Sequence, residues 1–248
     1  MTDRIRSLEA PFDAVVIGAS GGIGSALVAA LAADPSVNRI LAFSRSAAAN
    51  GGAKVGGGLL DLLDEGSIAS AANEAATLPR LRLVVVATGF LHGRGAMPER
   101  SLRELDPQAL ARAFAINAIG PAIVLKHFLP LLPRSGKSVM AALSARVGSI
   151  GDNRLGGWYG YRASKAALNQ LLRTAAIELA RTHREGIVLG LHPGTVATAM
   201  SQPFTAGYSA KPVFTPDYSA AKLLEVIDSA NVGASGTVID WRHEPVTP

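Results

Sequence analysis

The 248-residue chain contains no cysteine, which excludes disulfide bonds, thiolate metal ligands and a cysteine nucleophile. Aromatic residues account for only 5% of the chain and charged residues for 17%. We find no uninterrupted apolar run of about 18 residues, because a charged residue, glycine or proline breaks each candidate stretch. Residues 1–11 carry four charges and no apolar stretch follows them, which is not typical of a signal peptide. We therefore expect a cytoplasmic protein with no membrane partner and no metal site.

The formal charge is +5, but the lysines and arginines are scattered along the chain and do not form a basic block. No recognised nucleic-acid-binding motif accompanies this charge. The excess of positive charge would suit a phosphate-bearing small molecule, and we expect no nucleic-acid partner.

Short apolar runs alternate with longer helical stretches, which predicts βαβ units. The runs are apolar throughout, as expected for parallel strands covered on both faces. We predict an α/β fold in which residues 1–248 form one Rossmann domain, a doubly wound parallel sheet with helices on both faces. The expected strands are residues 14–17, 40–43, 58–60, 83–87, 138–143, 187–191 and 237–239, and the expected helices are residues 23–33, 66–77, 107–132, 159–181 and 216–229.

A glycine-rich turn, Gly18-Ala19-Ser20-Gly21-Gly22-Ile23-Gly24, joins the first expected strand to the first expected helix. Residues without Cβ let the backbone approach a pyrophosphate, and the helix N-terminus offers free N–H groups. The alternative is a turn that serves only close packing of helix on strand. The position directly after an apolar strand favours dinucleotide binding.

The second expected strand ends in Phe43-Ser44-Arg45, where an acidic residue would favour NAD. Arg45 could instead pair with the 2′-phosphate of NADP, with Ser44 and Ser20 as further donors. We therefore predict NADP, with NAD possible. The alternative is that Arg45 is a solvated residue at a loop edge.

Tyr161 and Lys165 lie four residues apart in an expected helix and share one face. An ammonium group and a cationic nicotinamide would lower the tyrosine pKa and make Tyr161 a general acid or base. Tyr159 has no such partner, because residue 163 is alanine. Ser144 closes an expected strand at the carboxyl edge of the sheet, where it could hold a substrate oxygen. Alternatively, Ser144 caps the strand, Tyr161 is a half-buried aromatic and Lys165 is a surface charge.

These motifs resemble the short-chain dehydrogenase/reductase family over nearly the whole chain. The resemblance implies that Tyr161 exchanges the proton of a small carbonyl or alcohol substrate, Ser144 positions its oxygen, Lys165 holds the nicotinamide ribose and Asn117 kinks the long helix and supports a proton relay. It adds cofactor contacts beyond those of the glycine turn and Arg45, with Tyr161 and Lys165 belonging to both sets. The full cofactor set is Gly18, Ser20, Gly22, Ile23, Gly24, Ser44, Arg45, Asp61, Leu62, Ala87, Thr88, Gly89, Tyr161, Lys165, Pro193, Gly194, Val196 and Thr198.

Residues 144–154 resemble the subgroup that contains the bacterial C-factor and the insect carbonyl reductase Sniffer. A cofactor-binding signalling or interaction protein with little turnover is therefore the alternative to an enzyme. The separation between Ser144 and Tyr161 is a few residues longer than usual in the family, so residues 151–157 should bulge out as a loop. Residues 199–214 are predicted to form a lid over a hydrophobic substrate. The resemblance also implies a homodimer or homotetramer that pairs through the long helices.

Overall fold

One seven-stranded sheet forms the centre of the molecule, with the strand order β3-β2-β1-β4-β5-β6-β7. The computed structural model describes residues 5–46, 52–93, 97–205 and 212–248. All six pairings between neighbouring strands are parallel. The strands are β1 (Phe12–Ile17), β2 (Val37–Phe43), β3 (Val55–Gly56), β4 (Leu81–Val86), β5 (Ser138–Leu143), β6 (Gly186–His192) and β7 (Val238–Asp240).

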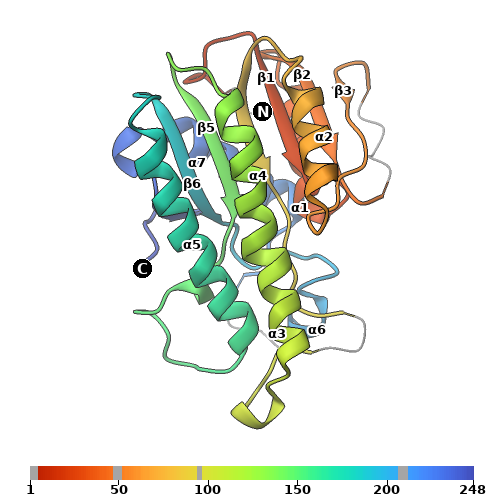
Figure 1. Cartoon of the computed structure of the whole chain (residues 1–248), viewed down its shortest axis with the longest axis vertical. Helices are drawn as coiled ribbons and strands as arrows, with labels where there is room; N and C mark the ends of the chain where they lie inside the picture. Colours follow the sequence, from red (N-terminus) through yellow and green to blue (C-terminus); the bar gives the residue numbers. More distant parts are fainter. Residues whose placement is uncertain (1–4, 47–51, 94–96, 206–211) are drawn as a thin grey trace.

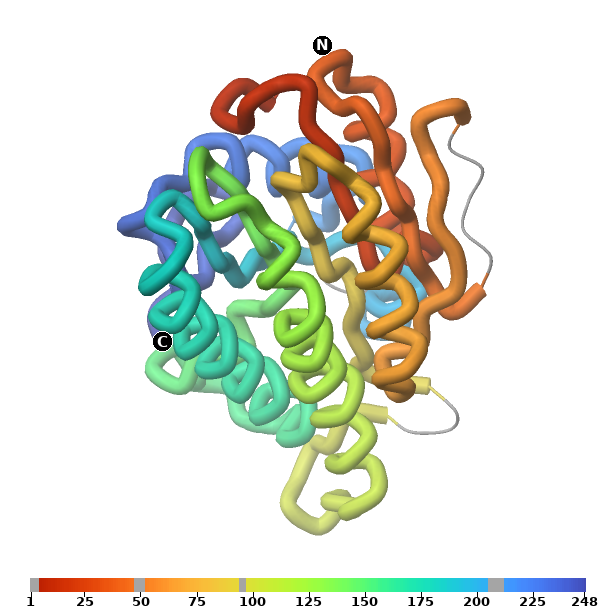
Figure 2. Tube along the Cα trace, turned by 45° about the horizontal axis from the view of Figure 1, so that its top comes forward, coloured from red at the N-terminus to blue at the C-terminus, as the bar shows by residue number. Residues whose placement is uncertain are grey.

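Helices cover both faces of this sheet, which confirms the doubly wound α/β fold (Figure 1). Along β1, Ala14 and Val16 belong to the apolar cluster of α1 and α7, whereas Val15 and Ile17 belong to that of α2, α4 and α5. Figure 2 shows α2, α4 and α5 side by side on their face. The helices are α1 (Gly22–Ala33), α2 (Glu65–Ala75), α3 (Pro107–Phe114), α4 (Gly120–Phe128), α5 (Tyr159–Leu179), α6 (Gln202–Thr205) and α7 (Pro216–Ser229).

The strand order reverses between β1 and β4, because β2 and β3 continue to one side of β1 and the later strands continue to the other. Ligands of open α/β sheets bind in the crevice outside the carboxyl ends of the strands at such a switch point. The glycine turn after β1 and the start of α5 both lie at this edge of the sheet (Figure 1).

A long helical stretch, from α3 through α4 to the short η3 (Leu129–Leu131), is interrupted by a π-helical segment, η2 (Ala115–Ile119). By length and composition this stretch could cross a membrane, which the sequence analysis did not anticipate. However, 39% of its most apolar window is buried inside the fold. α4 packs against α2 and α5 over the sheet, so the apolar residues are those of a core helix.

The expected strand at residues 58–60 was wrong. β3 is Val55–Gly56, and Leu59 makes only an isolated bridge to Ser44. Gly57, which has a φ of 118°, ends the strand in a conformation that other residues rarely adopt. In contrast, β5 and α7 begin and end at the predicted residues.

Candidate active site

The glycine turn brings the backbone of β1 against the first turn of α1. A β-carbon at Gly24 would overlap the carbonyl oxygen of Gly18, and one at Gly22 would lie 2.8 Å from Cγ2 of Thr198. Gly21 caps α1 without any side-chain hydrogen bond to the helix. The first N–H groups of α1 are therefore not capped by the N-cap side chain, which is the arrangement that binds a pyrophosphate.

Thr88, directly after β4, closes the other side of this cradle. Its Oγ1 is buried without a hydrogen-bond partner among the described residues. A β-carbon at Gly18 would lie 2.8 Å from Cγ2 of Thr88, so glycine is needed for this approach. A buried hydroxyl without a partner beside an open helix N-terminus fits a polar ligand such as the dinucleotide.

The residues predicted to discriminate NADP lie at the end of β2. Arg45 and Ser20 are exposed, whereas Ser44 is buried and its hydroxyl donates to the carbonyl of Ser46. Ser44 is therefore already engaged, which leaves Arg45 and Ser20 as the candidates for a phosphate.

The other predicted cofactor residues lie in loops around the same crevice. Asp61 accepts a hydrogen bond from the Leu63 amide at 3.0 Å. Leu62 packs at Gly120, where a β-carbon would lie 2.7 Å from Cβ of Leu62. The loop after β6 holds Pro193, whose carbonyl accepts from Ser219 Oγ at 3.0 Å, together with Gly194, Val196 and Thr198.

Lys165 and Tyr161 lie on one face of α5, as predicted. Lys165 is 2% exposed, and its Nζ donates to the carbonyl oxygen of Leu143 at 2.7 Å. The same Nζ lies 5.9 Å from the centre of the Tyr161 ring. Gly89 leaves room beside this ammonium, because a β-carbon there would lie 3.9 Å from Nζ.

The expected fall in the pKa of Tyr161 is not found in the protein alone. Burial raises the pKa of Tyr161 to about 12 and lowers the pKa of Lys165 to about 7. Both shifts have the same cause, since desolvation disfavours the charged form of each group. The tyrosine is therefore a neutral hydroxyl at neutral pH in the protein without cofactor.

Ser144, at the end of β5, is 3% exposed and reaches the same helix one turn further on. Its Oγ donates to Oδ1 of Asn169 at 2.5 Å. The extra residues between Ser144 and Tyr161 do bulge outward, as predicted: Ile150 is 78% exposed and Leu155 is 85% exposed. Asn169 was missed by the sequence analysis, although its position four residues after Lys165 places it on the catalytic face of the helix.

Asn117 lies in the π-helical segment, so the long helix is distorted where the resemblance implied a kink. Its amide exchanges two hydrogen bonds with the backbone of Phe90, at 2.7 and 2.8 Å. It also donates to Ser164 Oγ at 3.0 Å. Asn117 thus ties the loop after β4 to α5, and its role in a proton relay stays a prediction.

Aromatic rings from three segments meet beside Tyr161. Trp158 precedes α5 in a left-handed conformation, with a φ of 53°. Its ring lies 6.3 Å from that of Tyr161 and 5.1 Å from that of Phe204 in α6. Phe204 in turn lies 5.5 Å from the ring of His92. Within the predicted lid, residues 206–211 lie outside the described residues.

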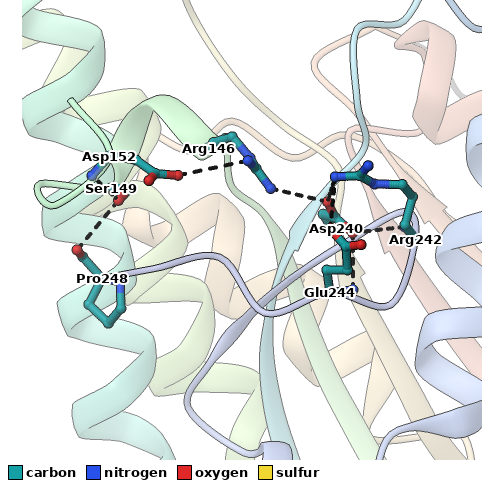
Figure 3. Close-up of polar contacts among 7 residues, drawn as sticks. All are labelled: Arg146, Ser149, Asp152, Asp240, Arg242, Glu244 and Pro248. Carbon is teal, nitrogen blue, oxygen red and sulfur yellow. Dashed lines mark hydrogen bonds and ion pairs between the residues drawn. The ribbon is translucent and has the colours of Figure 1, made fainter. Parts of the chain in front are cut away.

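A polar network fastens the loop after Ser144 to the edge of the sheet (Figure 3). Arg146 lies 3.8 Å from Asp152 in that loop and 3.4 Å from Asp240 at the end of β7. Arg242 contacts the same Asp240 carboxylate at 3.4 Å. The carbonyl of Pro248 accepts from the Gly151 amide at 3.0 Å. Asp240, which the sequence analysis did not identify, is the 1% exposed centre of this network.

Replacing Asp240 with Asn should destabilise the fold by about 1–3 kcal/mol at neutral pH, because one carboxylate oxygen and its charge are lost from a buried network. Burial alone would raise the pKa of Asp240, but the amides of Arg242 and Glu244 and the Arg242 guanidinium outweigh it, so the pKa is lowered from 3.8. The stabilisation is therefore present above pH 3.8 and is lost as the pH falls through the lowered value. Urea unfolding at several pH values measures the difference, and a gap that widens in acid would contradict this account.

Comparison with known proteins places these features in a family. The model of the short chain dehydrogenases matches residues 13–209. The chain is 36% identical over 146 residues to 1-hydroxy-2-glutathionyl-2-methyl-3-butene dehydrogenase of Rhodococcus sp. (strain AD45), covering 58% of this chain and 61% of that protein. It is 38% identical over 147 residues to the C-signal protein of Myxococcus xanthus, covering 59% and 82%. The match to the Rhodococcus protein thus spans less than two thirds of its length.

Solved structures extend the likeness to the whole fold. The NADPH-bound carbonyl reductase from chicken fatty liver superposes with a TM-score of 0.83 at 23% identity, covering 98% of this chain and 96% of that one. The carbonyl reductase Sniffer of D. melanogaster has a TM-score of 0.81 at 20% identity, with coverage of 97% and 100%. At these identities the likeness establishes the fold.

Proposed function

The chain belongs to the short-chain dehydrogenase family, and we propose that it is an NADP-dependent reductase of apolar carbonyl compounds. The observation that carries the proposal is the position of Tyr161 and Lys165 on one face of α5, where Asn169 of the same face binds Ser144 at the carboxyl edge of the sheet that also holds the glycine turn. The NADPH bound by its structural neighbour from chicken supports the choice of cofactor.

Each residue of the site has a separate task in this proposal. The glycine turn and the N-terminus of α1 would hold the pyrophosphate, and the unpartnered Thr88 hydroxyl would be available to bond the cofactor. Bound NADPH supplies the hydride that reduces the carbonyl carbon. Ser144 donates a hydrogen bond to the carbonyl oxygen and Tyr161 transfers its proton to that oxygen, which gives the alcohol. The pKa of about 12 means that Tyr161 carries its proton in the protein without cofactor, and a nearby positive charge would have to lower this pKa for efficient proton donation.

The substrate class follows from the walls of the site. The Trp158 ring lies edge-on to the rings of Tyr161 and Phe204, and Met200 lies in the loop between β6 and α6. Such rings bury apolar area and leave few polar groups for a charged substrate. We therefore propose hydrophobic ketones, aldehydes or quinones as substrates, with a second copy of the chain paired through the outer faces of α4 and α5.

The proposal is tested by mixing the purified protein with NADPH or NADH and a panel of such carbonyl compounds, and following the oxidation of the reduced cofactor. Turnover with NADPH would support the reductase. Tight NADPH binding without turnover on any compound would favour a cofactor-binding signalling protein, the alternative that the similarity to the Myxococcus C-signal protein suggests.

Replacing Arg45 with Asp should weaken NADPH binding by about 10- to 100-fold, because a charged hydrogen-bond donor is replaced by a charge that repels the 2′-phosphate. NADH lacks this phosphate, so its affinity should change much less. Arg39→Asp makes the same charge change at an exposed site within β2 and serves as the control. Fluorescence titration with both cofactors measures the two affinities, and equal losses for NADPH and NADH would exclude Arg45 as the phosphate ligand.

A further inference from the structure

Two side chains of α5, Lys165 and Asn169, form hydrogen bonds at the end of β5, and Asn169 has no role in the proposed chemistry so far. Tyr161, Lys165 and Asn169 follow one another at intervals of four residues and so share a face of the helix. Lys165 Nζ binds the Leu143 carbonyl, and Asn169 Oδ1 accepts the proton of Ser144 at 2.5 Å.

Close packing holds Asn169 and Ser144 together. The turn η4 (Arg146–Gly148) that follows Ser144 lies directly on α5. A β-carbon at Gly148 would lie 2.9 Å from Cβ of Lys165 and 3.1 Å from Nδ2 of Asn169. The glycine therefore lets the strand end press against the helix, which leaves the amide and the hydroxyl little freedom to separate.

A serine hydroxyl has one proton to donate and lone pairs with which to accept. While that proton goes to Asn169 Oδ1, it is not available to a substrate. If the Asn169 amide rotates by about 180° around the Cβ–Cγ bond, Nδ2 donates to Ser144 Oγ and the serine proton is free for another acceptor. Among the described residues, Asn169 forms no hydrogen bond through Nδ2, so this rotation breaks no second bond to the protein.

We propose that Asn169 is a positioning residue that controls the direction in which Ser144 donates. With its N–H group toward Ser144 Oγ, the amide directs the serine proton to the carbonyl oxygen of the substrate. The inference rests on the proposed reductase function, because it assigns Asn169 to the same site.

Asn169→Asp tests the direction of donation, because an ionised carboxylate of nearly the same shape can only accept. It should hold the Ser144 proton and lower kcat by about tenfold or more at neutral pH. As the pH is lowered toward about 4, near the ordinary pKa of an aspartate, the carboxylate gains a proton to donate, so the ratio of variant to wild-type kcat should rise. Asn169→Ala should lower kcat without this added pH dependence.

Gln170→Glu is the matched control, since it makes the same amide-to-carboxylate change at the next, exposed position of α5. It should leave both kcat and its pH profile as in the wild type. A kcat of Asn169→Asp within about twofold of wild type at every pH would overturn the inference. So would a loss that does not depend on pH in both Asn169 variants.

A measurement without turnover separates this inference from the proposed function. In the NMR spectrum of the ¹⁵N-labelled protein, the side-chain amide resonances of Asn169 are identified by their absence from Asn169→Asp. They should shift in Ser144→Ala if the two groups are bonded, and unchanged resonances would overturn the inference. Absence of wild-type turnover on the whole panel would instead count against the reductase.

Discussion

Replacing Tyr161 with Phe should lower kcat for carbonyl reduction by about 10²- to 10⁴-fold, the contribution typical of a general acid. The substitution removes one hydroxyl and keeps the half-buried ring, so the contact with Trp158 and the fold should survive. NADPH should bind almost as tightly as before, because the glycine turn and Arg45 are untouched. Steady-state kinetics and cofactor titration of the variant measure the two quantities.

Tyr159→Phe provides a matched control two residues away. Tyr159 begins α5 but has Ala163, not a lysine, four residues further on. Its hydroxyl therefore lacks the ammonium neighbour, and its loss should change kcat little. Equal losses in the two variants, or full activity of Tyr161→Phe, would remove Tyr161 from the role of acid.

The fold was predictable because parallel strands and their helices carry strong local patterns. β5 is buried at all six positions, and its apolar run marks both ends. The start of α7 is marked by Thr215, whose hydroxyl accepts from the Tyr218 amide, and by Pro216 in the first turn. β3 was misplaced because two paired residues, one of them Gly56, leave almost no pattern to read.

The candidate site was predictable where its residues share an element. The spacing of Tyr161 and Lys165 matches the period of one helix, and the glycine turn is recognised by its position directly after a strand. Contacts between distant segments carry no such pattern. The bond between Ser144 and Asn169 and the approach of Arg146 to Asp240, 94 residues apart, depend on how β5, α5 and β7 pack.

The pKa values of the site also could not be read from the sequence, because they depend on burial. Neighbouring positions in a helix suggested an ammonium that stabilises a phenolate. In the fold, desolvation dominates for both groups, so Tyr161 holds its proton and Lys165 loses part of its charge near neutral pH. The same burial keeps Tyr161 protonated and makes the charge of Lys165 unfavourable for the stability of the fold.

Replacing Lys165 with Met should therefore stabilise the protein and abolish its proposed activity. A lysine pKa lowered from 10.5 to about 7 corresponds to roughly 5 kcal/mol of unfavourable burial. Loss of the bond to the Leu143 carbonyl offsets about 1 kcal/mol or more. We expect a net gain of roughly 2–4 kcal/mol in the free energy of unfolding below pH 7, together with loss of turnover.

The stability gain of Lys165→Met should depend on pH. Because the folded-state pKa lies below the unfolded value, the unfolded chain binds the proton more tightly, and the penalty is complete below about pH 7. It shrinks as the pH rises toward 10.5, where the lysine is largely neutral in both states. Urea unfolding of both proteins without cofactor, across this range, should show the stability gain of the variant decline as the pH rises.

Lys137→Met is the control, because it removes a lysine whose ammonium has several acceptors. Its Nζ donates to the carbonyls of Ile227 and Asp228 at the end of α7 and to Ser7 Oγ. Burial lowers the pKa of Lys137 as well, but three hydrogen bonds are lost with this ammonium against one for Lys165, so Lys137→Met should not show the stability gain of Lys165→Met. If Lys165→Met were less stable than the wild type at pH 6, the bond to Leu143 would outweigh the cost of burial. In that case Lys165 would hold β5 and α5 together, and its ammonium group would serve the fold as well as the proposed chemistry.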